Sequence, residues 1–154
     1  KRLYETTGAV PEEDYTIPFG RAAVRREGSD CTLVSYSLMA LRCGEAADVL
    51  SGEGIACEVI DLRTLVPLDM GAVLGSVRKT GRLAVVSEAV KRGSVASDIA
   101  ARAAEEGFRF LKAPILRVCG KNTPVPYNAA LERAVVPDVP SIADAVRRLL
   151  GESG

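Results

Sequence analysis

The sequence predicts an α/β fold, with a mainly parallel sheet covered by helices on both faces. Short apolar, β-branched runs alternate along the chain with longer segments in which apolar residues recur at helical spacing. The clearest case is residues 55–69, where a buried strand, its end before Pro67 and a helix start at Asp69 follow one another. At 154 residues and 47% hydrophobic content, the chain is long enough for the core of about one domain.

Composition excludes several functional classes. Lysine plus arginine equals aspartate plus glutamate at 20 each, so there is no electrostatic case for nucleic acid or an anionic membrane. No apolar run approaches the ~20 residues that span a bilayer. Histidine is absent, which removes the usual general base and the usual zinc ligand. The chain starts without methionine or a signal peptide, so we expect it to be part of a longer protein.

The four cysteines are scattered and form no C-x-x-C pair. They are Cys31, Cys43, Cys57 and Cys119. Three of them fall in expected strands, so buried, reduced thiols of a cytoplasmic protein are favoured over a disulfide or metal site.

The first third of the chain is expected to contain a connector, two strands and a helix. Residues 1–20 are polar, include two prolines and lack periodicity, which predicts a connector. Residues 22–26 and 31–36 are strand candidates, and only a short turn separates them, which favours a hairpin. Ser37 is expected to cap the following helix, which ends at Gly52 and Gly54.

The central unit follows. Residues 57–62 form the buried strand, and Asp69 caps a helix with an apolar stripe that continues to Gly81. Arg78 and Lys79 precede that glycine, where cations complement the helix dipole.

The last third is expected to hold two strands and three helices. A strand at 82–87, a loop at 88–93 and a helix capped by Ser94 come first, and Pro114 precedes a strand at 115–119. A short helix capped by Asn128 is expected to run through Val135 and to be stopped by two prolines. Ser141 with Asp144 resembles a capping box for a terminal helix.

Ligands of open α/β sheets bind beyond the carboxyl ends of the strands, so functional residues are expected in these loops. No G-x-G-x-x-G motif follows the first strand, which argues against a dinucleotide site. Arg63 follows the central strand, and Lys91, Arg92 and Ser94 follow the next one, where a helix start could contact an anion. A solvated basic loop with a serine cap is the favoured alternative.

Two further features are candidates for a role outside the core. Glu88 ends a buried strand; a general acid or base is conceivable, but no histidine or second carboxylate is adjacent, so a structural or interface role is favoured. Pro124, Pro126 and Tyr127 form a stiff apolar loop, which suits internal packing and a contact surface equally.

Several motifs in order carry a resemblance to a known family. VIDLRTLVPLD, RLAVVSEA, SVASDIAARAAEEGF and GKNTPVPYNAALE resemble the C-terminal domain of the β subunit of thiamine-diphosphate-dependent 2-oxo acid dehydrogenase E1 components, a group that includes pyruvate, branched-chain and acetoin dehydrogenases. The domain is similar to the C-terminal domain of transketolase. The resemblance covers essentially the whole chain, and the opening residues 1–20 resemble the connector from a preceding pyrimidine-binding domain, which leaves 21–154 as the domain itself.

The resemblance implies a three-layer α/β/α fold. Its sheet would have five mostly parallel strands, with the first antiparallel and beside the third in sequence order, and this arrangement is preferred here to the hairpin. The cofactor of the parent enzyme, thiamine diphosphate with magnesium, would lie between other domains, so no cofactor is expected on this chain alone. The implied partners are an E1 α subunit, a second β subunit in a heterotetramer, and the acyltransferase E2 core.

The leading hypothesis is therefore a non-catalytic assembly domain of an E1 enzyme. Arg147 and Arg148 are expected only as exposed charges near a docking end, and Ser87 and Asn122 depart from the His and Asp common in relatives. The parent substrate, a 2-oxo acid or acetoin, stays open. The alternatives are an independent anion- or nucleotide-binding module and a fragment of a transketolase-type transferase.

Overall fold

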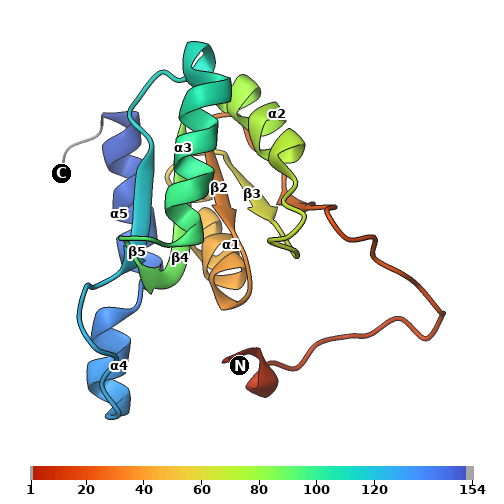
Figure 1. Ribbon diagram of the computed structural model, residues 1–154, viewed down its shortest axis with the longest axis vertical. Coiled ribbons are helices and arrows are strands. Elements are labelled where there is room, and N and C mark those ends of the chain that lie inside the picture. Colours follow the sequence, from red (N-terminus) through yellow and green to blue (C-terminus); the bar gives the residue numbers. More distant parts are fainter. Residues whose placement is uncertain (1, 152–154) are drawn as a thin grey trace.

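The computed structural model describes residues 2–151, and these form a five-stranded sheet between two layers of helices (Figure 1). The strands are β1 (Ala23–Arg26), β2 (Cys31–Ser35), β3 (Cys57–Asp61), β4 (Leu83–Val90) and β5 (Leu116–Gly120), in the spatial order β1-β3-β2-β4-β5. The helices are α1 (Leu38–Ser51), α2 (Met70–Thr80), α3 (Val95–Gly107), α4 (Ala129–Val135) and α5 (Val139–Leu150), with 3₁₀ turns at Arg2–Glu5 and Phe108–Phe110.

Alternating strand residues divide the core into two halves. In β2, Leu33 packs beneath α1 and α5, whereas Val34 packs beneath α2 and α3. Val59 and Ile60 of β3 divide in the same way. Because both faces are covered, β2 is buried at every position. The predicted three-layer α/β/α class is confirmed.

The first strand lies antiparallel beside β3, as the family resemblance implied, and the hairpin suggested by the short turn is wrong. The turn crosses the start of β3 instead, so that β2 pairs parallel with β3 on its other side. Gly28 makes this crossing possible, since a Cβ there would lie 2.2 Å from the carbonyl carbon of Cys57. The amides of Ser29 and Asp30 both donate to the carbonyl of Ala56, at 3.0 and 2.9 Å, and hold the turn against the strand.

A buried group of three hydroxyls ties α2 to the central strand. Thr32 Oγ1 lies 2.6 Å from Ser76 Oγ and 2.7 Å from Thr80 Oγ1, and all three residues are buried. Thr80 also donates to the carbonyl of Arg82 at 3.1 Å. These polar groups satisfy one another, so the helix can sit on the strand in only one register without leaving a hydroxyl unpaired.

A single buried carboxylate in the sheet is satisfied by a lysine from α2. Glu58 of β3 is 3% exposed and forms an ion pair with Lys79, whose ammonium also lies 2.7 Å from Glu27. The bond from Lys79 lowers the pKa of the Glu27 carboxyl, and Glu27 with Glu58 raises the pKa of Lys79. Lys79 therefore does more than complement the helix dipole, because it balances the charge of Glu58.

The central βα unit begins and ends as predicted. Asp69 caps α2, accepting from the Ala72 amide at 3.0 Å, and Gly81 ends that helix with a φ of 75°. The second oxygen of Asp69 accepts from the Ala22 amide at 2.9 Å, so the same carboxylate also holds the chain that enters β1. Asn128 caps α4 as predicted, through the amides of Ala130 and Leu131.

One predicted helix start is wrong, and two predicted caps lack their side-chain hydrogen bond. Helix α5 begins at Val139, because Asp138 is its cap and forms a capping box with Ser141; the predicted box of Ser141 with Asp144 is wrong. Pro140 lies in the first turn of α5, where the backbone amide has no acceptor within the helix, so the proline does not interrupt this helix. Ser37 and Ser94 do occupy N-cap positions, but neither side chain makes a capping hydrogen bond.

Strand β4 is longer than predicted and extends through Val90, so Glu88 and Ala89 belong to the strand and not to the loop. The expected connector has no strand or α-helix over residues 6–22 and carries only the short 3₁₀ turn before them. Within the described residues, no helix has the length and hydropathy required to cross a bilayer.

We expect Thr32→Val to lower the free energy of unfolding by about 1–3 kcal/mol, because it leaves the buried Ser76 hydroxyl without its partner. Urea denaturation of the chain would measure this difference. Thr32→Ser is the matched control, since it retains the hydroxyl and loses one methyl group, and it should be less destabilising than valine. A valine variant as stable as the parent chain would contradict the proposed role of the hydroxyl group.

Candidate functional site

An arm formed by residues 121–135 projects from the carboxyl end of β5 and carries α4 away from the rest of the domain (Figure 1). The Lys121 amide donates to the carbonyl of Val135 at 2.9 Å, which joins the two ends of the arm. The chain leaves the sheet at Gly120, where a Cβ would lie only 2.5 Å from the carbonyl oxygen of Glu88. The base of the arm is therefore fixed, although most side chains of the arm face outward.

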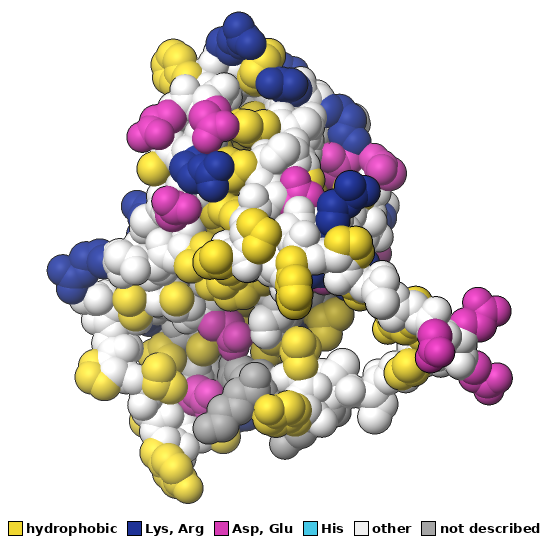
Figure 2. Space-filling view, turned by 45° about the vertical axis from the view of Figure 1, so that its right-hand side comes forward, with side chains coloured by type: hydrophobic (Ala, Val, Ile, Leu, Met, Phe, Trp, Pro, Cys, Tyr) yellow, Lys and Arg dark blue, Asp and Glu magenta, His cyan; other side chains and the backbone are white. Residues whose placement is uncertain are grey.

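The arm exposes large apolar side chains. Val125 is 69% exposed, Leu131 is 57% exposed and Tyr127 is fully exposed. Helix α4 buries none of its own side chains in the domain. Hydrophobic side chains also mark this lower end of the molecule in the space-filling view (Figure 2). Such a patch suits a contact surface better than internal packing, the other role considered for this loop.

The two prolines of the arm differ in environment. Pro124 is exposed and Pro126 is half-buried. Asn122, one of the two departures from the family pattern, is exposed at the start of the arm. The assignment of Pro124, Pro126 and Tyr127 to subunit contact stays a prediction.

Glu88 lies within the last part of β4 and is half-buried. Its neighbour Ser87, the other departure, is buried and lies 2.9 Å from the hydroxyl of Tyr36, which links the ends of β2 and β4. The Ser87 hydroxyl also accepts from the Ala89 amide at 3.2 Å. Ser87 is thus a structural connection between strands, and the structural or interface role of Glu88 stays a prediction.

The four residues proposed to contact an anion do not line one common hollow. Arg63, with a φ of 58°, lines a hollow of about 890 Å³ beside the connector, whereas Lys91 lines a separate hollow of about 490 Å³ beside β5. Arg92 is exposed and lines neither hollow. The Ser94 hydroxyl is buried and has no hydrogen-bond partner among the described residues. Anion binding by these residues stays a prediction.

Arg147 and Arg148, the two arginines expected near a docking end, differ in their environments. The side chain of Arg147 is only 31% exposed and pairs with Glu53 at 2.6 Å and with Asp144 at 2.5 Å. It is therefore half-buried and paired, contrary to the expectation of an exposed charge. It holds α5 to the residues that follow α1. Arg148 is exposed.

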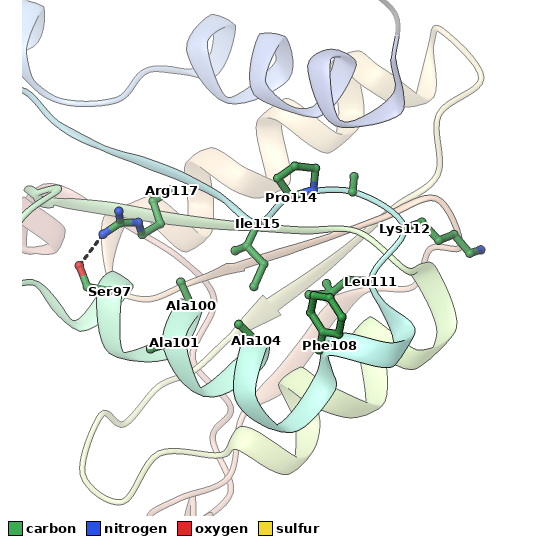
Figure 3. A pocket seen from close by; sticks show the side chains of 11 residues that line it. Ser97, Ala100, Ala101, Ala104, Phe108, Leu111, Lys112, Pro114, Ile115 and Arg117 are labelled. Atoms are coloured by element: carbon green, nitrogen blue, oxygen red, sulfur yellow. Dashed lines mark hydrogen bonds between the residues drawn. The ribbon is translucent and has the colours of Figure 1, made fainter.

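A further hollow of about 760 Å³ lies between α3 and the stretch that enters β5 (Figure 3). Its wall combines small and apolar side chains, among them Ala100, Ala104 and Ile115, with the exposed ring of Phe108. Arg117 crosses one end and donates to Ser97 Oγ at 2.6 Å. Sequence reasoning missed this hollow because the small residues of α3 gave no chemical signal.

Buried thiols were predicted for the four cysteines; all four are free thiols, but only Cys31, Cys43 and Cys57 are buried. Cys119 is only half-buried. Burial raises the pKa of Cys57 to about 11 and raises those of Cys31, Cys43 and Cys119 as well. No set of three His, Cys, Asp or Glu side chains in the described part of the chain could hold a metal ion.

Comparison with known proteins gives a consistent result. The model of the family "Transketolase, C-terminal domain" matches residues 20–142. The β subunit of an acetoin:2,6-dichlorophenolindophenol oxidoreductase from Cupriavidus necator is 49% identical over 150 residues, which is 97% of this chain and 44% of the relative. The pyruvate dehydrogenase E1 component β subunit of Rhizobium meliloti is 42% identical over 146 residues, 94% of this chain and 32% of the relative.

A solved structure shares the fold. The chain described as "Split gene transketolase, inactive beta4 tetramer" superposes with a TM-score of 0.81 and 28% identity, covering 96% of this chain and 48% of the other. The present chain thus spans less than half the length of each of these relatives.

We expect a thiol reagent such as Ellman's reagent to modify Cys119 first, and the other three thiols only after unfolding. With a pKa of about 11, Cys57 would hold only about one thiolate in a thousand at pH 8, and burial also blocks access. The absorbance of the coloured thiolate that the reagent releases would count the reacting thiols. The count would be made once for the folded chain and once for the chain unfolded in guanidinium. The control is Cys119→Ser, which should abolish the native-state reaction; rapid modification of two or more thiols in the folded chain would contradict this prediction.

Proposed function

The chain belongs to the transketolase C-terminal domain family, and from this membership we propose that it is the assembly domain of an E1 β subunit. The parent would be a thiamine-diphosphate-dependent dehydrogenase complex for a 2-oxo acid or acetoin. In such an enzyme the substrate is oxidatively decarboxylated or cleaved and its acyl group passes to lipoamide. Relatives named as β subunits of acetoin and pyruvate enzymes, at 49% and 42% identity, support this branch over a transketolase-type transferase.

The observation that carries the assembly role is the exposed apolar arm. Val125, Tyr127 and Leu131 would be unfavourably placed in water unless a partner covers them, and the arm is fixed at its base by the bond between Lys121 and Val135. An apolar surface on a fixed base is what subunit contact requires. We infer that an E1 α subunit or a second β subunit covers it in a heterotetramer, and that the far end of this domain contributes to docking the E2 core.

The residues of this chain do not fit a site for thiamine diphosphate with magnesium. The described residues hold no group of three candidate metal ligands, and the loop after β2 lacks the glycines that let a backbone approach a diphosphate. The chain also has no histidine for proton transfer. We therefore propose that the connector, residues 1–20, joins this domain to an upstream pyrimidine-binding domain that takes part in holding the cofactor, in a cytoplasmic enzyme.

Thiamine diphosphate with magnesium should not bind the chain alone, because the donors needed for its diphosphate and metal are lacking here. Isothermal calorimetry should give no heat of binding at about 1 mM cofactor. A complete thiamine-dependent enzyme in the same buffer is the positive control. Micromolar affinity for the isolated chain would refute the proposal that the cofactor site lies in other domains.

Replacing Tyr127 and Leu131 by serine should weaken subunit assembly by at least about tenfold, because central apolar side chains dominate interface energies. The melting temperature of the chain itself should stay within about 2 °C, since both side chains are exposed. Light scattering of co-expressed α and β subunits would measure the assembly.

Val66→Ser is the matched control for this pair, because Val66 is 91% exposed on a loop outside the arm. It should leave assembly unchanged. Unimpaired assembly of the Tyr127 and Leu131 variant would remove the arm from the subunit interface.

A further inference from the structure

The two edges of the sheet are built differently. The β1 edge is short, with four residues, and its register with β3 is interrupted between Val24 and Arg26. Both of its arginines form ion pairs, Arg25 with Asp61 and Arg26 with Asp48. Shortness, irregular pairing and charge are the means by which proteins protect an edge strand from further pairing. The β1 edge is thus a protected edge.

The β5 edge has a regular register over four residues, and its register shifts only before Gly120, which pairs with Val90. Its residues 116–119 pair in unbroken order with residues 84–87 of β4. In a parallel pair, alternate residues direct their amide and carbonyl groups away from the partner strand. No backbone bond other than those to β4 is found for residues 116–120 within residues 2–151. The outer row of amides and carbonyls is therefore available for another strand.

A hollow of about 490 Å³ follows this edge. It is lined by all five residues of β5 together with Ser141 and Arg148 of α5 and with Lys91. Successive side chains of a strand point to opposite faces, so a hollow in contact with every one of the five runs along the edge and not over one face. Its position leaves room beside the strand where a sixth strand would lie.

The lining of this hollow is strongly basic. Lys91, Arg117, Lys121 and Arg148 contribute to it, and no carboxylate does. Lys91, Lys121 and Arg148 are exposed, and none of their side chains makes an ion pair with any described residue. The whole chain has a net charge of zero, so this concentration of positive charge is local. Two β5 edges from two copies would bring these like charges together, which disfavours self-pairing.

We propose that β5 accepts an extended acidic segment of a partner protein as a sixth strand. The partner's backbone would pair with the free amides and carbonyls of residues 116–120, and its carboxylates would lie against Lys91, Lys121 and Arg148. The bond between Lys121 and Val135 ends the accessible edge, so the segment would pair with about five residues of β5. This inference does not depend on the proposed E1 function, because it needs only the open edge and its charges.

The test uses a synthetic peptide of about ten residues that alternates glutamate and valine, added to the ¹⁵N-labelled chain. Hydrogen exchange followed by NMR should show new protection of β5 amides, whereas the amides of β1 should not change. A peptide of the same sequence in which every backbone amide is N-methylated lacks the backbone donors and should give no protection. Protection by both peptides, or by neither, would overturn strand addition.

The charge reversals Lys121→Glu and Arg148→Glu, made together, should weaken binding of the acidic peptide by at least about tenfold. Both side chains are exposed, and circular dichroism would confirm that the variant folds. The matched control is Arg102→Glu on α3, which lies outside the hollow and should leave the affinity unchanged.

Two other outcomes would also overturn the proposal. Equal binding of the parent chain and the double charge reversal would show that the basic lining does not select the partner. Protection of β5 amides that rises with chain concentration in the absence of peptide would show that a second copy occupies the edge.

Discussion

The close approach of Gly28 to the backbone of Cys57 and Glu58 is the contact on which the arrangement of the sheet depends. A side chain at this position would meet main-chain atoms at 2.2–2.6 Å and could not be accommodated by a rotamer change. Because the chain crosses here, β1 runs antiparallel outside β3, and β2 becomes the buried centre. The remaining strands can then add only on the far side of β2, which makes β5 the opposite edge.

Burial of the central strands β2 and β3 explains why their polar side chains are paired. Thr32 and Glu58 lie on the covered strands, where an unpaired hydroxyl or carboxylate would be costly. Both find their partners on α2, at Ser76, Thr80 and Lys79. The same helix is therefore fixed at its start by Asp69 and along its length by polar bonds, which offsets the low helix propensity of its two internal glycines.

Sequence patterns predicted the elements that depend on local chemistry. Asp69 and Asn128 cap helices because each carboxylate or amide oxygen reaches amides two or three residues ahead, and that spacing is visible in the sequence. The pairing of β1 was not visible, because the short turn before β2 fits a hairpin and only the tertiary contact at Gly28 reveals the crossing. Asp138 was missed as a cap because Pro140, taken as a helix stop, lies in the first turn.

The candidate contact surfaces were less predictable from the sequence, because they too depend on tertiary contacts and not on local patterns. Glu88 was placed in a loop because a polar residue after an apolar run is a good stop signal, yet pairing with β5 continues the strand to Val90. The apolar loop containing Tyr127 was recognised, but its exposure depends on how far α4 stands from the domain, which no local pattern encodes. The hollow beside β5 likewise collects Lys91, Lys121 and Arg148 from three separate segments.

The fold places attachment and contact at opposite edges. The connector joins the domain beside β3, where Thr64 accepts from the Gly20 amide at 2.9 Å and Asp69 accepts from Ala22, and Figure 2 shows its acidic residues standing away from the rest. At the other edge of the sheet lie β5 and the arm with its apolar side chains (Figure 1). Ion pairs within the domain occupy both arginine side chains of β1, whereas Lys91, Lys121 and Arg148 beside β5 form no ion pair with the described residues. Under the two proposals made above, a partner would gain most at the β5 edge, because there basic side chains without a charged partner and exposed apolar area lie at the same side of the sheet.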